Sequence, residues 1–71
     1  MTDTVLLEQK IQESGYKTSH IADKLGLTFQ GFQNKRKGVS EFYAKEIVIL
    51  SDLLKLTKRE REQIFFNQKV D

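Results

Sequence analysis

The sequence predicts an all-α fold, a compact domain of five short helices, and three observations lead to that prediction. Apolar residues recur at helical spacings along most of the chain. Gly15, Gly26 and Gly38 directly follow such apolar segments, where a residue in the left-handed conformation often ends a helix. No run of alternating apolar and polar residues reaches the length of a strand, and no proline interrupts the helical segments.

The first two helices are recognised by their ends. The first is expected at residues 4–14 and stops at Gly15. Thr18 or Ser19 can accept the free backbone N–H groups at the start of a second helix. This second helix is barely two turns long, because Gly26 closes it.

A third helix follows the second almost at once. Thr28 is a good N-cap, and the helix is expected over residues 29–37, where Gly38 ends it. Ser40 precedes an acidic residue that favours a helix start, and helical apolar spacing then continues to Leu54. This fourth helix is expected to be the longest of the five.

The last helix begins with Thr57-Lys58-Arg59-Glu60, which fits a capping box. It is expected to run through Phe66, and residues 67–71 are expected to fray. All five helices are assigned to a single domain spanning residues 1–71, because a chain of this length can build only one small core.

The composition excludes several classes of protein. The chain has no cysteine, which rules out a disulfide framework, a thiolate zinc site and a cysteine nucleophile. Its longest apolar run, residues 47–50, is far shorter than a membrane span, and no basic and apolar leader stands at its start. We therefore expect a protein of a reducing cytoplasm that makes no membrane contact.

The positive charge is concentrated in one segment. The whole chain carries a formal net charge of only +2. Between Gly15 and Ser40, five basic residues stand against one acid, a net charge of +4, whereas the remainder has seven basic residues against nine acids, a net charge of −2. Such a cluster is either a solvated helix surface or a nucleic-acid-binding patch, and charge alone does not decide between them.

Residues 18–38 have the spacing of a helix-turn-helix. Two short helices that cross closely need a small residue at the crossing, which Ala22 provides. Gly26 tolerates the left-handed turn, and Thr28 restarts the helix. Phe32 then faces back toward the first helix of the pair. The residues expected to hold this arrangement are Ile21, Ala22, Leu25, Gly26, Leu27 and Phe32.

Three segments carry a resemblance to a known family. Residues 21–27 resemble the first helix and turn of small helix-turn-helix regulators of the Cro and phage-repressor type, and so does the passage of residues 38–42 into a long helix. Residues 56–66 are similar to short proteins of temperate phages of Gram-positive bacteria. The length and the N-terminal segment resemble Cro-like and modulator-of-repression proteins of lactococcal temperate phages.

The resemblance implies a regulator that acts in the cytoplasm of a bacterial host, in the switch between lysogeny and lysis. Its implied partners are double-stranded operator DNA and either a second copy of the chain or a phage repressor, with no small-molecule substrate. The alternative function is an antirepressor, whose main activity is to bind the repressor and alter or block its DNA binding. An antitoxin or another host regulator on the same fold also remains open.

The resemblance also implies that residues 29–37 enter the major groove, where Gln and Asn pair with adenine and Arg or Lys address guanine. Arg36 departs from the family, which often has an aliphatic residue there, and we expect its stem to pack while its guanidinium points outward. The residues expected to read bases are Phe29, Gln30, Gln33, Asn34 and Lys37. Those expected to contact the DNA backbone are Lys17, Thr18, Thr28, Lys35 and Arg36.

The last two predicted helices contain more apolar residues than one face of each helix can bury. Residues 47–50 are apolar all round the helix, and adjacent Phe65 and Phe66 cannot both face the same core. Phe29 has three open interpretations: contact with a thymine methyl group, packing beside Phe32, or a protein interface. The alternative to an interface is that these residues are isolated exposed apolar side chains, which are common on protein surfaces. The interface residues expected toward a second copy or a repressor are Phe29, Tyr43, Val48, Ile49, Phe65 and Phe66.

No catalytic or metal-binding residue is expected. His20 lies beside Ser19 and three residues before Asp23, but neighbouring helix residues point in different directions, and the chain has no second histidine. We expect His20 on a helix surface near a phosphate. Glu60 and Glu62 resemble paired carboxylates, yet Glu60 is explained by the capping box. The sequence therefore predicts a protein without enzymatic activity or cofactor.

Overall fold

The computed structural model describes residues 1–67 and contains five helices in this range. No strand occurs within residues 1–67, so the predicted all-α fold is confirmed. The radius of gyration is 11.3 Å, close to the value of about 11 Å expected for a compact chain of this length. The helices are α1 (Thr4–Ser14), α2 (Thr18–Lys24), α3 (Phe29–Arg36), α4 (Ala44–Leu53) and α5 (Lys58–Phe65).

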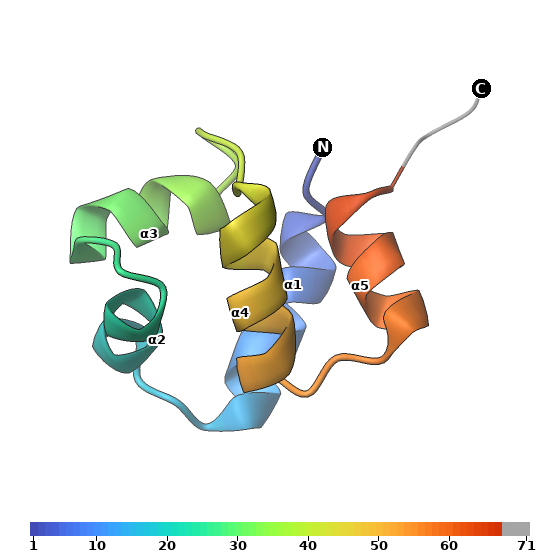
Figure 1. Ribbon diagram of the computed structural model, residues 1–71, viewed down its shortest axis with the longest axis horizontal. Coiled ribbons are helices and arrows are strands. Elements are labelled where there is room, and N and C mark those ends of the chain that lie inside the picture. The colour runs from blue at the N-terminus through green and yellow to red at the C-terminus, as the bar shows by residue number, and fades with distance from the viewer. Residues whose placement is uncertain (68–71) are drawn as a thin grey trace.

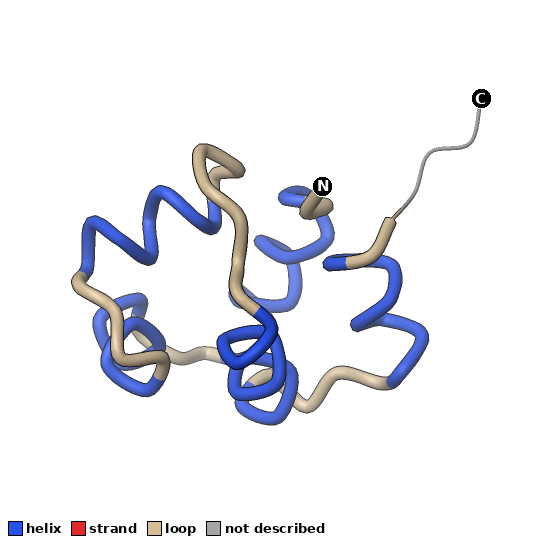
Figure 2. Tube along the Cα trace, turned by 45° about the horizontal axis from the view of Figure 1, so that its top comes forward, coloured by secondary structure: helices blue, strands red, loops and turns tan. Residues whose placement is uncertain are grey.

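The helices are arranged with α2 and α3 at one end of the molecule, α5 at the other, and α1 and α4 between them (Figure 1). The turned view in Figure 2 shows the same order. α2 packs against α3 and α4, whereas α1 contacts α3 and α5. The start of the chain is tied to α5, because the Asp3 N–H donates to the Ile64 carbonyl at 2.7 Å.

Helix capping explains most of the helix boundaries. α1 covers the predicted residues, with Asp3 accepting a hydrogen bond from the Leu6 N–H at 3.0 Å and Gly15 at a φ of +73°. The predicted capping box of α5 is also confirmed. The Thr57 hydroxyl accepts from the Glu60 N–H at 3.1 Å, and a Glu60 carboxylate oxygen accepts from the Thr57 N–H at 2.9 Å.

Two predicted helix starts and one predicted helix length are wrong. Thr18 does not cap α2 but is its first residue, and the cap position is taken by Lys17 without a side-chain hydrogen bond. α4 begins after Tyr43 rather than after Ser40, and at 10 residues it is shorter than the 11-residue α1. The late start coincides with a capping contact, because the N–H of Tyr43, the N-cap residue, donates to the Glu46 carboxylate at 2.8 Å.

The ends of α3, α5 and the tail are close to the prediction. α3 stops one residue early, at Arg36, and α5 ends at Phe65 instead of Phe66. Asn67 is exposed beyond α5. The rest of the tail that was predicted to fray, residues 68–71, lies outside the described residues.

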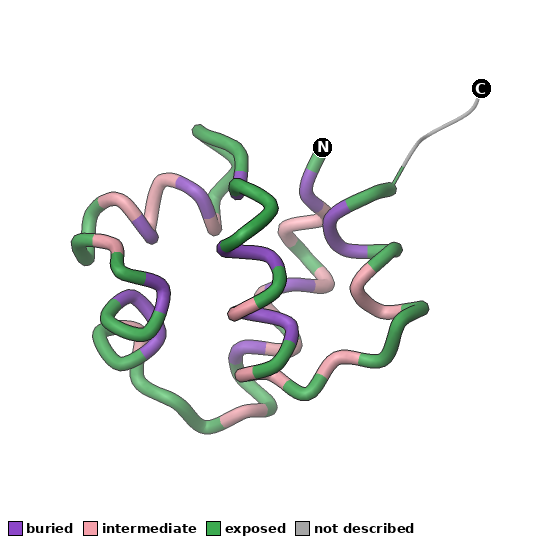
Figure 3. The backbone as a smooth tube through the Cα atoms, in the orientation of Figure 1, coloured by how far each residue is buried: buried purple, intermediate pink, exposed green. Residues whose placement is uncertain are grey.

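The core receives side chains from all five helices, and the buried positions line the inner sides of the helices in Figure 3. Phe42 joins the two ends of the molecule, because its ring lies edge-on to Phe32 at 6.3 Å and to Phe65 at 5.5 Å between centroids. The buried apolar residues are Leu7, Ile11, Ile21, Ala22, Leu25, Phe32, Phe42, Ile47, Leu50, Ile64 and Phe65.

The connection between α2 and α3 is a short turn in which Gly26 has a φ of +71°. The N–H groups of Gly26 and Leu27 donate to the carbonyls of Asp23 and Ala22, at 3.0 and 2.9 Å. This pairing satisfies carbonyls that the end of a helix otherwise leaves free. The turn thereby fixes where α3 starts relative to α2.

Candidate nucleic-acid interface

α2 holds one face of α3 through a buried apolar contact. Ile21 and Phe32 are fully buried, and Ala22 and Leu25 are nearly so. Leu27, in the turn, is half-buried and packs on the same core. The burial predicted for these residues is confirmed. Because this contact uses only the inner face of α3, the opposite face is left to solvent.

The outer face of α3 consists of Phe29, Gln30, Gln33 and Asn34, together with Lys37, which directly follows the helix. Residues three or four positions apart lie on the same side of a helix, and this face is polar apart from Phe29. The Gln30 side-chain amide donates to the Asn34 carbonyl oxygen at 3.0 Å, which orders both side chains. Of the residues predicted to read bases, Phe29, Gln30 and Lys37 are exposed and Gln33 and Asn34 are half-buried.

Lys35 does not point to solvent. Its ammonium group donates to a carboxylate oxygen of Glu46 on α4, and the two side chains are only 10% and 9% exposed. The ammonium also lies 3.9 Å from the centroid of the Tyr43 ring. The predicted contact of Lys35 with the DNA backbone is therefore withdrawn, because a cation buried in an ion pair cannot reach a phosphate.

Arg36 also turns inward, contrary to the prediction of an outward guanidinium. The guanidinium forms hydrogen bonds with both carboxylate oxygens of Glu8 on α1, with distances of 2.7, 2.9 and 3.2 Å. It also donates to the Thr18 hydroxyl at 2.9 Å and to the Gln33 side-chain oxygen at 3.0 Å. A planar guanidinium can satisfy several acceptors at once, which explains why Arg36 fits where an aliphatic residue was expected.

This pairing lowers the pKa of Glu8. The hydrogen bonds from the Arg36 guanidinium lower the pKa of Glu8 below its ordinary value, and partial burial opposes the effect without cancelling it. Glu8 is 45% exposed at its side chain whereas Arg36 is 10% exposed. The last turn of α3 is therefore held on two sides, by α1 through Arg36 and by α4 through Lys35.

The two threonines predicted to contact the DNA backbone accept hydrogen bonds from other groups of the protein. Thr18 accepts from Arg36, and Thr28 accepts from the Gly31 N–H at 3.0 Å as the N-cap of α3. Thr28 is exposed, so its hydroxyl remains accessible from outside. The exposed cations near this end of the molecule are Lys17, Lys24 and Lys37.

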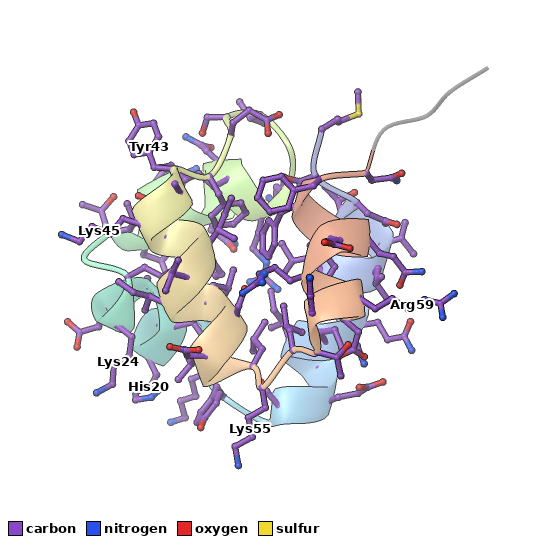
Figure 4. The ribbon with its side chains drawn as sticks, turned by 45° about the vertical axis from the view of Figure 1, so that its right-hand side comes forward. His20, Lys24, Tyr43, Lys45, Lys55 and Arg59 are labelled. Carbon is purple, nitrogen blue, oxygen red and sulfur yellow. The ribbon has the colours of Figure 1, made fainter. Side chains whose placement is uncertain are left out.

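Figure 4 shows Lys24 and His20 of α2 and Lys45 of α4 projecting outward on one side of the molecule. Lys45 was not among the predicted site residues. His20 is exposed as predicted, and its ring stacks on Tyr16 at 5.1 Å between centroids. Residues 1–67 contain no group of three or more metal-ligating side chains.

The predicted partner interface is only partly on the surface. Phe29, Tyr43, Val48 and Phe66 are exposed, between 53% and 71%. Phe65 is buried, so its assignment to an interface is wrong, because its ring packs on Phe42 instead. Ile49 is half-buried and packs against the core. Phe29 is also not part of the buried core.

The two acidic partners, Glu8 and Glu46, were missed by the sequence reasoning. A signal existed for Glu46, because an acidic residue in the first turn of a helix is a candidate for a capping box. It does serve that role, since the Tyr43 N–H donates to its carboxylate at 2.8 Å. Glu8 lies 28 residues from Arg36 in the chain, and no local pattern marks a pair so distant.

Comparison of the chain with family models, curated proteins and solved structures finds no match. Within the described residues, no helix is both long and apolar enough to cross a membrane. The function is therefore inferred from the geometry of α3, from the charges around it and from the sequence.

Proposed function

We propose that the chain is a transcriptional regulator of a phage switch between lysogeny and lysis, in which α2 and α3 form a helix-turn-helix that binds operator DNA. The observation that carries the proposal is the division of α3 into two faces: Phe32 is fully buried against α2, whereas Gln30 and Lys37 are exposed on the other side. The phage setting and the host cytoplasm rest on the resemblance of the sequence to regulators of temperate phages.

The outer face of α3 can reach the bases from the major groove. An α-helix with its side chains is about 10–12 Å in diameter, and the major groove is about 12 Å wide. In that groove, amide and ammonium groups on the outer face reach base edges, and Phe29 is available for a thymine methyl group. The proposed contacts position no reacting group, so the proposed activity is binding without catalysis or cofactor.

One α3 reads only a few base pairs, so affinity for an operator requires two such helices. We therefore propose that the chain acts as a homodimer or in a complex with a phage repressor. Sedimentation of the isolated chain distinguishes these options, because a homodimer has twice the mass of the monomer of 8.3 kDa.

The salt dependence of duplex binding tests the proposal. A labelled duplex of random sequence is titrated with the chain at about 50 and 200 mM salt, and binding is followed by fluorescence anisotropy. Each phosphate contact contributes about −0.9 to the slope of log K against log salt. With Lys35 and Arg36 paired internally, Lys17 is the exposed cation left among the predicted backbone contacts and Lys37 the exposed cation among the predicted base readers. If each neutralises one phosphate, the expected slope is about −2 for each bound chain. No binding at the lower salt concentration contradicts DNA binding by the chain alone.

A second candidate function is an antirepressor that binds the repressor protein. Two observations favour it: two of the three consecutive cations on α3 are neutralised internally, and Tyr43, Val48 and Phe66 expose apolar surface. In this case the isolated chain binds no duplex, but it changes the binding of the repressor to its operator. The same anisotropy assay, with the repressor and its operator present, separates the two functions.

A further inference from the structure

The orientation of one amide on the outer face of α3 is fixed by chemistry. Arg36 Nη1 lies 3.0 Å from the side-chain oxygen of Gln33. A guanidinium group carries only donors, so the Gln33 atom that faces it must be the carbonyl oxygen and not the amide nitrogen. One lone pair of the Gln33 oxygen is consequently taken, whereas both N–H groups of its amide have no hydrogen-bond partner within the described residues.

Arg36 is itself held in place. Glu8 accepts hydrogen bonds from Nε and Nη2 of the guanidinium, and Thr18 accepts a further one from Nη1. The guanidinium therefore has contacts from α1 and α2 before it reaches Gln33. With its side chain only 10% exposed, Arg36 has little freedom to move away from the Gln33 oxygen.

We propose that Glu8 and Arg36 are positioning residues that hold the Gln33 oxygen toward Arg36 and favour donation by its N–H groups, so that Gln33 recognises guanine rather than adenine. This inference rests on the proposed DNA-binding function and deepens it. Adenine presents one acceptor and one donor in the major groove, so a glutamine pairs with it bidentately only if its oxygen can turn toward the base together with its nitrogen. Guanine presents two adjacent acceptors, N7 and O6, which suit an amide that offers N–H groups alone.

The proposal revises the sequence-based expectation for Gln33. Residue type alone predicts adenine, because Gln and Asn are the usual partners of that base. The contact from Arg36 occupies one of the two lone pairs of the oxygen on which that pairing depends, and it restrains the direction in which this oxygen points. Asn34 has no such contact with a guanidinium within the described residues, and its oxygen accepts instead from Gln30, which is another amide.

The first arm of the test uses the free protein. Side-chain ¹⁵N relaxation is measured for the Gln33 amide in the wild type and in Arg36→Met, with the exposed Gln63 on α5 as an internal reference. The expected order parameter of Gln33 is above about 0.6 in the wild type and falls below about 0.6, toward that of Gln63, in the variant. Equal values for the two glutamines in the wild type overturn the positioning role.

The second arm measures base preference by selection from a pool of randomised duplexes. The position read by Gln33 is the one whose preference disappears in Gln33→Ala. At that position the wild type is expected to prefer guanine over adenine by about tenfold, and Arg36→Met is expected to shift the preference to adenine. Glu8→Gln, which weakens the hold on Arg36, is expected to shift it in the same direction by a smaller factor.

Arg59→Met is the matched control, because it also replaces an arginine by methionine but on α5, at the opposite end of the molecule (Figure 4). It is expected to leave the base preference unchanged. A wild-type preference for adenine, or the same preference in the wild type and in Arg36→Met, overturns the guanine assignment. If the wild type binds no duplex at all, the DNA-binding function and the guanine assignment both fall, while the relaxation data still decide whether Arg36 positions Gln33.

Discussion

The two phenylalanines of α3 lie three residues apart and have opposite environments. Phe32 is fully buried between α2 and Phe42, whereas Phe29 is 53% exposed at the start of the helix. The comparison shows how a helix of eight residues serves two purposes. Its inner face attaches it to the domain by hydrophobic burial, and its outer face remains free for a partner.

The same division separates three consecutive basic residues. Lys35 pairs with α4, Arg36 pairs with α1, and Lys37 is exposed. Successive residues on a helix point about 100° apart, so neighbours in sequence meet different surroundings. A basic run is therefore not a basic surface, and in this protein two of the three charges stabilise the last turn of α3.

The largest expected effect comes from the buried phenylalanine. Phe32→Ala leaves a cavity in the core and is expected to lower the free energy of unfolding by about 3–5 kcal/mol, measured by urea denaturation followed by circular dichroism. Phe29→Ala, its matched control, is expected to change it by less than about 0.5 kcal/mol. Similar losses in the two variants contradict the two-face description. If Phe32→Ala does not fold, Phe32→Leu supplies the comparison with an expected loss of about 1 kcal/mol.

The next effect comes from the ion pair between Lys35 and Glu46. Lys35→Met leaves the Glu46 carboxylate with no cation in a site where it is 9% exposed, and the expected loss of stability is about 3 kcal/mol. The double variant Lys35→Met/Glu46→Gln removes both charges and keeps an acceptor for the Tyr43 N–H. It is expected to recover most of the loss. A single variant as stable as the wild type indicates that Lys35 is solvated instead.

The pair between Glu8 and Arg36 is more exposed and is expected to contribute less. Glu8→Gln is expected to cost about 1 kcal/mol at neutral pH, because solvent screens the half-exposed carboxylate. The folded-state pKa of Glu8 lies below its ordinary value of 4.5, so this contribution is present above that value and is lost as the pH falls through the folded-state pKa. The stability difference between wild type and variant should therefore shrink below pH 4.5. A difference that stays constant down to acid pH excludes the ion pair as its cause.

The smallest effect on stability is expected at Lys37, and there the readout is DNA binding. Lys37→Gln is expected to change the free energy of unfolding by less than about 0.5 kcal/mol. It should make the salt slope of duplex binding shallower by about 0.9, because one phosphate contact or groove charge is lost. Lys35→Met/Glu46→Gln should leave that slope unchanged. An unchanged slope in Lys37→Gln together with a shallower slope in the double variant means that Lys35, and not Lys37, faces the DNA.

Much of the fold could be predicted because its signals are local. Gly15, Gly26 and Gly38 end helices at positive φ, and Thr28 and Thr57 cap helices through their own side chains. Each of these effects acts within a few residues and can be read from the chain. The start of α4 also has a local signal in Glu46, which accepts from the Tyr43 N–H, although the sequence analysis placed the start earlier. The packing of Phe42 between Phe32 and Phe65 has no such local signal, because it joins residues that are distant in sequence.

The outer face of α3 could also be predicted, because helical spacing separates it from Phe32. The sequence did not reveal whether the cations of this segment are exposed or paired within the protein. Whether Lys35 and Arg36 reach solvent depends on Glu46 and Glu8, which only the packing of α4 and α1 against α3 brings close. The exposed charge of a short basic segment is therefore known only once its ion-pair partners on other helices are known.

The central claim is that the outer face of α3 is the surface that contacts DNA. The most direct measurement is an NMR titration of the ¹⁵N-labelled chain with a duplex at low salt, in which backbone and side-chain amide shifts are mapped onto the structure. We expect the largest shifts at residues 28–37, including the side-chain amides of Gln30, Gln33 and Asn34. Shifts centred on Val48 and Phe66, or no shifts at any duplex concentration, would contradict it.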